Sequence, residues 1–227
     1  MFNEFKYNSI VIISTLSRTE TPTGKILYDQ LKPLERMYSK KIRFVYADTI
    51  SALDTAFDEV VEEIEKDGIF PILHLDAHGH RDLGLGVDGI SLCYNWNTVV
   101  HNCREINSRL QNNLLLTIAA CEGVGAICGS NEVTFSFLEP TPFGCMVAPI
   151  EEIFVSDLER IYPRFFTELL STNSLTNAYQ QLEGLCYSYN CEEVFVKAWL
   201  KYTAETTPPI VEDKAERLLP KAKAQIW

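Results

Sequence analysis

The sequence has no long apolar run. No segment approaches the ~20 apolar residues that a helix needs to span a bilayer. The first nine residues include Asn3, Glu4 and Lys6, where a signal peptide would carry its apolar centre. We therefore expect a cytoplasmic protein with no membrane partner.

Basic residues are scarce. The chain has 20 Lys and Arg against 31 Asp and Glu, a formal net charge of -11. Nucleic-acid binding requires a basic surface that neutralises phosphates, so we expect no nucleic-acid partner. The acidic balance mildly favours basic partners or substrates and otherwise indicates solubility.

Paired cysteines are also missing. The seven cysteines are irregularly spaced and form no CxxC pair, which argues against a zinc ribbon and against a dithiol redox site. Most of them lie in apolar surroundings, where cysteine behaves as a small hydrophobic residue. There is no internal repeat and no linker, so we expect one domain over residues 1–227, with a tail at 210–227.

Short apolar strands alternate with amphipathic helices along the chain. The expected strands are Ile10–Ile13, Ile42–Tyr46, Ile69–Leu75, Leu114–Ala120 and Phe143–Ile150. The expected helices contain Ile26–Tyr38, Leu53–Ile64, Val99–Leu110, Leu158–Leu170 and Leu175–Tyr187, and Gly84, Gly86 and Gly89 indicate a small hairpin. This order predicts an α/β domain with a mostly parallel sheet and helices on both faces.

Local signals indicate where some helices begin and break. Pro33 predicts a kink or break within the first helix. Ser51 with Asp54, and Ser156 with Glu159, resemble capping boxes and predict two helix starts. Gly68 is expected to end the helix that precedes it.

A histidine and a cysteine follow two of the predicted strands. Open parallel sheets bind ligands beyond the carboxyl ends of their strands, and His78 and Cys121 both fall there. A cysteine nucleophile needs a base that generates its thiolate and donors for the developing oxyanion. Cys121 with His78 would form the pair, and the N–H groups of Gly79 and Cys121 would be the donors.

The residues around this pair resemble a known family. Leu73–His80, LHLDAHGH, resembles the His-Gly block of caspase-like cysteine peptidases, and more closely that of CHAT domains, caspase relatives akin to separase. Thr117–Gly123, TIAACEG, looks like the matching Ala-Cys block. The interval is 121 − 78 = 43 residues, near the ~50 of the caspase signature. The likeness runs from about Ile10 to about Leu185.

The resemblance implies a caspase-like three-layer sandwich and a cysteine endopeptidase. His78 and Cys121 would form a catalytic dyad acting on a protein substrate without a cofactor. Activity would be gated by a partner protein or by self-assembly, and a role in bacterial cell death or antiviral defence follows by analogy. Ala119 stands where caspases carry a pocket-lining Gln, so cleavage after aspartate is not expected.

The pocket for the residue before the cut would draw on several strand ends. The predicted pocket residues at these ends are Ser17–Arg18, Asp76, Ala119 and Ile150–Glu152. Asp76 or Glu151 would supply a buried carboxylate that favours a basic side chain. If these carboxylates instead point to solvent or pair with Arg18, an apolar residue is expected.

Two other hypotheses about the function remain open. One is a catalytically silent caspase-like interaction module, against which the intact His-Gly and Ala-Cys blocks argue. The other is a zinc hydrolase built on His74, Asp76, His78 and His80, which alternate at period two. A strand spreads these side chains too far for all four to share one metal, and a hydrogen-bonded core histidine is the expected role of His74.

Overall fold

The computed structural model describes residues 6–89, 92–127 and 141–190. The chain divides into two units, Met1–Asn190 and Cys191–Trp227. All described residues belong to the first unit, and the predicted tail at 210–227 lies outside the described residues.

A six-stranded sheet forms the centre of the described unit. Its strands are β1 (Ser9–Ser14), β2 (Lys41–Tyr46), β3 (Pro71–Asp76), β7 (Leu115–Ala119), β8 (Cys145–Pro149) and β9 (Cys186–Asn190). Their order is β2-β1-β3-β7-β8-β9, and only the β8–β9 pairing among these is antiparallel. β1, β3, β7 and β8 are buried at every position, as expected for strands covered on both faces.

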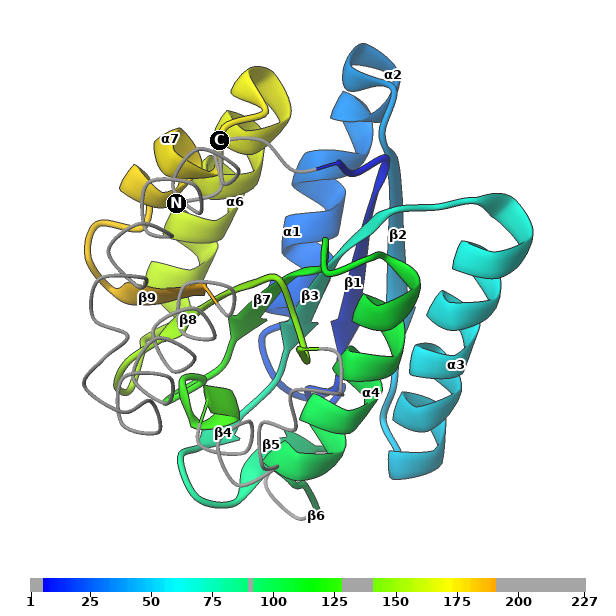
Figure 1. Cartoon of the computed structure of the whole chain (residues 1–227). Helices are drawn as coiled ribbons and strands as arrows, with labels where there is room; N and C mark the ends of the chain where they lie inside the picture. Colours follow the sequence, from blue (N-terminus) through cyan, green and yellow to red (C-terminus); the bar gives the residue numbers. More distant parts are fainter. Residues whose placement is uncertain (1–5, 90–91, 128–140, 191–227) are drawn as a thin grey trace, which may run out of the picture. The chain divides into compact units, whose positions relative to one another are not determined.

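Helices cover both faces of this sheet (Figure 1). One face packs against α1 (Thr23–Leu31), α6 (Val155–Thr172) and α7 (Leu175–Gln180), whose apolar residues join Ile12, Ile72 and Leu115 in one cluster. The other face carries α3 (Ile50–Asp67) and α4 (Trp96–Arg109). The predicted α/β class, with a mostly parallel sheet between helices, is confirmed.

Pro33 breaks the first helix as its sequence indicates. α1 ends at Leu31, a 3₁₀ turn, η1, covers Lys32–Leu34, and α2 covers Glu35–Tyr38. Proline lacks an N–H and its ring crowds the preceding turn, so the α-helical hydrogen-bond ladder stops there. Gly68 also has its predicted role, because it follows α3 in the left-handed conformation, at φ 63°.

The predicted glycine-rich hairpin is a small antiparallel sheet of β4 (Gly79–His80), β5 (Gly84–Val87) and β6 (Leu92–Tyr94). It follows β3 directly, so the segment after His78 is held by pairing with β5.

Both predicted capping boxes are wrong. Thr49, not Ser51, caps α3, and its side chain accepts the N–H of Ala52. α6 begins at Val155, one residue before Ser156, and its N-cap residue Phe154 has no side-chain capping bond. In each case the helix starts earlier than the Ser-x-x-acid pattern indicated, because Thr49 and Phe154 both have extended backbone.

The predicted helix over Leu175–Tyr187 is wrong in its second half. α7 ends at Gln180, and Cys186–Asn190 instead forms β9 beside β8. Glu183 and Gly184 both have positive φ, at 54° and 78°, which turns the chain out of the helix.

Candidate active site

His78 and Cys121 follow neighbouring parallel strands at the same edge of the sheet. Asp76 at the end of β3 pairs with Ala119 at the end of β7, and the Ala77 N–H donates to Ala119 O at 3.2 Å. His78 and Cys121 each stand two residues beyond these partners. Both strands end at Asp76 and Ala119, which point to the face covered by α1 and α6. His78 and Cys121 therefore lie in the two loops that leave this edge of the sheet.

Gly79 brings the two segments into direct backbone contact. A Cβ atom on Gly79 would lie 2.1 Å from the carbonyl oxygen of Cys121 and 2.9 Å from Cβ of Ala120. Only a residue without a side chain permits this approach. The main chain after His78 therefore touches the residue that carries the thiol.

The N–H of Gly79 is directed away from β5. The Gly86 N–H donates to His78 O at 2.9 Å, and Gly79 is the next residue along, opposite Leu85. Hydrogen-bonded and non-hydrogen-bonded pairs alternate in an antiparallel ladder, so Gly79 occupies a non-hydrogen-bonded position. This orientation suits the predicted oxyanion donor.

The imidazole of His78 is held by a carboxylate. Its Nε2 lies 2.7 Å from Oε1 of Glu20, in the loop between β1 and α1. The Ser17 N–H donates to the other oxygen of Glu20 at 2.8 Å. Burial opposes ionisation of Glu20, but the bonds from His78 and Ser17 and the charge on His78 together lower its pKa.

The thiol of Cys121 is half-buried and contacts a loop residue that precedes α6. The Ile153 N–H donates to Sγ at 3.5 Å, and the thiol donates to Ile153 O at 3.7 Å. Cys121 Sγ and His78 Nε2 therefore bond to Ile153 and Glu20, and not to each other. Catalytic hydrogen bonds are often loose before substrate binds, so this geometry is compatible with a resting enzyme.

The loop after Cys121 is braced by Arg81. Glu122 has a positive φ of 51°, and its N–H donates to Glu151 O at 3.0 Å. Its carboxylate accepts the Arg81 N–H at 3.0 Å, and the Arg81 guanidinium donates to Ile150 O at 3.1 Å. Three loops at this sheet edge are thus tied together around Cys121.

A narrow cavity lies between α1 and α6 on the same face of the sheet. Two of the predicted pocket residues, Asp76 and Ala119, line it, and Thr23, Glu159 and Tyr162 are among its other walls. Its volume is about 10 Å³, roughly the room of one water molecule.

Asp76 at this cavity is buried and already hydrogen-bonded. Ser14 and Thr23 donate their hydroxyls at 2.6 and 2.5 Å, and the Gly24 N–H donates at 2.8 Å. Burial raises the pKa of Asp76, and these three bonds oppose that rise.

The other nominated pocket residues lie elsewhere. The Glu151 side chain is exposed and is not part of this cavity, while its main chain supports the Cys121 loop. Arg18 lies 3.6 Å from Asp48 and does not pair with Asp76.

The alternating histidines have three different surroundings. His74 is buried, bonds to Thr117 Oγ1 at 2.8 Å and packs edge-on against Tyr162 and Phe166. His78 bonds to Glu20, and the exposed His80 accepts the Asp82 N–H at 3.2 Å. Within residues 6–89, 92–127 and 141–190, no group of three or more His, Cys, Asp or Glu is arranged to hold a metal ion.

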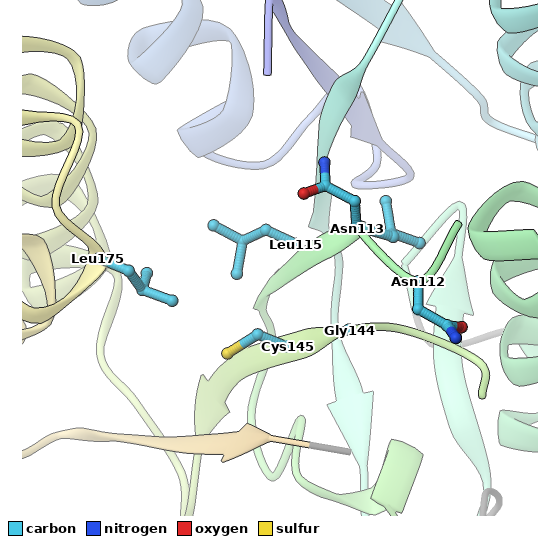
Figure 2. A pocket seen from close by; sticks show the side chains of 7 residues that line it. Asn112, Asn113, Leu115, Gly144, Cys145 and Leu175 are labelled. Atoms are coloured by element: carbon cyan, nitrogen blue, oxygen red, sulfur yellow. The ribbon is translucent and has the colours of Figure 1, made fainter. Parts of the chain in front are cut away.

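A second pocket lies at the opposite edge of the sheet (Figure 2). Leu115 begins β7 and Cys145 begins β8, and both line this pocket with Leu175 of α7. The amide groups of Asn112 and Asn113 on its rim bond to Asn107, Thr141 and Lys6. These bonds tie neighbouring segments together, so we assign this pocket a structural role.

Three residues of the site were not identified from the sequence. Glu20 and Ile153 lie in loops, and no spacing pattern relates them to His78 or Cys121. Glu159 faces the cavity from the second turn of α6, where the sequence indicated only part of a capping box. An acidic residue in the loop after the first strand was the one available signal for Glu20.

The fold and the site together define a mixed α/β protein with a His–Cys pair at the carboxyl edge of a mostly parallel sheet. No family model matches the chain, and a search of curated proteins finds no significant match. None of the helices in the described part of the chain is long and apolar enough to cross a membrane.

Proposed function

We propose that the chain is a caspase-like cysteine endopeptidase, related to CHAT domains, that hydrolyses a protein substrate. The observation that carries the proposal is the convergence of His78 and Cys121 at one edge of the sheet, with Gly79 against the Cys121 backbone. A thiol, a base and a backbone donor at one edge are the groups that acyl transfer requires.

The proposed reaction has two stages. Cys121 Sγ attacks the scissile carbonyl as its proton passes to His78, and the Gly79 N–H stabilises the oxyanion. His78 then protonates the leaving amine, which departs and leaves a thioester on Cys121. Water attacks the thioester with His78 as base, which releases the acid product and restores the thiol. None of these steps requires a cofactor or a metal.

Two observations support the proposal that activity is gated. The thiol is held by Ile153, and the cavity beside Asp76 has room for about one water molecule. A substrate side chain would enter only after α1 and α6 move apart. We propose that a partner protein or self-assembly provides this change. A part in bacterial defence or cell death would follow from the family resemblance.

Peptide-library profiling of the activated protein tests the proposal. Cys121→Ala and His78→Ala should each lower turnover by about 10²-fold or more with the fold intact, because groups that act as a unit lose most of their effect singly. Cys145→Ala, at the opposite sheet edge, should change stability more than rate. Turnover of Cys121→Ala at the wild-type rate would show that Cys121 is not the nucleophile.

Inhibitors separate the three functional classes. Thiol alkylation should abolish a peptidase, whereas a chelator should abolish a zinc hydrolase. A silent interaction module would have no turnover to inhibit and would retain partner binding after alkylation of Cys121.

The cavity supports a preference for a basic residue before the cut. Asp76 contributes a carboxylate with three of its roughly four acceptor positions used, and Glu159 contributes a second carboxylate at the wall. An acidic substrate side chain would face both. We expect cleavage after Arg to exceed cleavage after Leu, and cleavage after Asp to be slowest.

Matched peptides with Arg, Leu or Asp at this position decide the preference. Glu159→Gln should reduce the Arg-over-Leu ratio by about tenfold, since a lost charged hydrogen bond is worth ~1.5 kcal/mol. Glu168→Gln, nine residues further along α6 and outside the cavity, should leave the ratio unchanged. Fastest cleavage after Asp would refute both the basic and the apolar version of this pocket.

A further inference from the structure

We propose that Glu20 is a positioning residue for His78, which makes the catalytic unit a Cys121–His78–Glu20 arrangement rather than a dyad. The inference rests on the proposed function and adds a residue to it. It starts from the 2.7 Å contact between Glu20 Oε1 and His78 Nε2. Neither the His-Gly block nor the Ala-Cys block contains Glu20.

The main chain of Ser17 holds both the carboxylate and the backbone of Glu20 in place. The Ser17 N–H donates to Glu20 Oε2 at 2.8 Å, while the Glu20 N–H donates back to Ser17 O at 3.0 Å. The end of the same loop is anchored, because Thr23 and Gly24 bond to buried Asp76. Glu20 therefore reaches His78 from a loop that is fixed at its turn and at its exit.

An ionised Glu20 determines the tautomer of His78. A carboxylate only accepts hydrogen bonds, so Nε2 must carry the proton that lies between them. In neutral His78 this leaves Nδ1 as the basic nitrogen. Nδ1 is the ring nitrogen nearer the main chain, and the main chain at residue 79 is what contacts Cys121.

The same contact favours the charged form of the pair. Proton transfer from Cys121 creates an imidazolium on His78, and the negative charge of Glu20 stabilises it at 2.7 Å. Both side chains are more than a third exposed, at 40% for His78 and 34% for Glu20, so solvent screens part of the attraction. The effect on thiolate formation should therefore be moderate, and the effect on ring orientation larger.

Glu20→Gln tests the proposal in the full chain, because it keeps the size of the side chain and removes the charge. We expect the neutral His78 ring to lose its single Nε2–H tautomer in ¹⁵N NMR spectra. We expect alkylation of Cys121 by iodoacetamide at pH 6 to slow by about two- to fivefold. Peptidase kcat should fall about tenfold with little change in KM.

Two further variants make the result specific. Asp48→Asn removes one negative charge near the same loop, where Asp48 lies 3.6 Å from Arg18, and should change none of these readouts. Glu20→Asp keeps the charge on a shorter side chain and should recover part of the tautomer preference.

The outcomes distinguish this inference from the proposed function. If Glu20→Gln keeps the wild-type tautomer and alkylation profile while Cys121→Ala and His78→Ala abolish turnover, Glu20 has no positioning role and the peptidase proposal stands. If instead Cys121→Ala retains turnover, the peptidase proposal itself fails, whatever Glu20 does to the ring.

Discussion

At the scale of single residues, Gly79 is a position in the site where a larger side chain is poorly tolerated. The φ of Gly79 lies outside the left-handed region, so alanine could adopt its backbone conformation. The obstacle is space, since the new Cβ would lie 2.1 Å from the Cys121 carbonyl oxygen. That oxygen belongs to the main chain and cannot rotate away as a flexible side chain would.

Gly79→Ala should therefore damage the site more than the fold. We expect turnover to fall by about 10²-fold, because a displacement near 1 Å at reacting groups has that cost. We expect a loss of about 1–3 kcal/mol in unfolding free energy from overpacking. The rate of cleavage of a peptide substrate measures the effect on turnover, and chemical denaturation measures the effect on the unfolding free energy.

Gly68→Ala is the matched control. Gly68 has a positive φ and nothing within 4 Å of its Cβ position, so alanine there costs roughly 1 kcal/mol of backbone strain without touching the site. If Gly79→Ala turned over the peptide as fast as Gly68→Ala does, the close approach of Gly79 to Cys121 would have no catalytic role.

At the scale of elements, the start of α3 separates a sequence pattern from the cap that the fold uses. Thr49 has extended backbone, and its hydroxyl accepts the Ala52 N–H at 3.1 Å. Ser51 lies within the first turn of α3, where its main-chain carbonyl accepts the Thr55 hydroxyl. The capping contribution should therefore reside in Thr49.

Thr49→Ala should lower the unfolding free energy by about 1 kcal/mol, because it leaves an N-terminal N–H of α3 without its side-chain partner. Ser51→Ala should be neutral or slightly stabilising, since alanine is the better helix former inside a helix. Urea denaturation of the two variants measures the difference. A larger loss for Ser51→Ala would restore the capping-box interpretation.

At the scale of the whole molecule, His74 links stability to pH. Burial lowers the pKa of His74 to about 3, against an ordinary value near 6.5. The unfolded chain therefore binds a proton on this ring between about pH 6.5 and pH 3, while the folded protein does not. The stabilising effect is fully present above pH 6.5 and is lost as pH falls toward 3.

We expect this one ring to reduce the unfolding free energy by about 2 kcal/mol between pH 7 and pH 5, at ~1.4 kcal/mol per pH unit. Between pH 7 and pH 5, the unfolding free energy of His74→Leu should fall by about 2 kcal/mol less than that of the wild type. His101→Gln, on the exposed surface of α4, should keep the wild-type dependence. If the unfolding free energies of the wild type and of His74→Leu changed equally with pH, His74 would titrate normally in the folded protein.

The hydrophobic pattern was sufficient for the elements with strong periodicity. The β-branched run at Ile10–Ile13 and the apolar run at Leu114–Ala120 became β1 and β7, because a strand buried on both faces requires such a run. β9 was missed, since its aromatic and polar residues form a strand only by pairing with β8. Gly184 was the local signal for the preceding turn.

The sequence by itself determined the α/β class and placed His78, Gly79 and Cys121 at strand ends, because strand periodicity and glycine placement are local properties. Tertiary structure alone decided that Glu20 holds His78, that Ile153 holds Cys121, and that Asp76 is bonded by Ser14, Thr23 and Gly24. These partners are 32 to 62 residues apart in the chain. Contacts over such distances depend on how loops from different strands meet at one sheet edge, which no local pattern encodes.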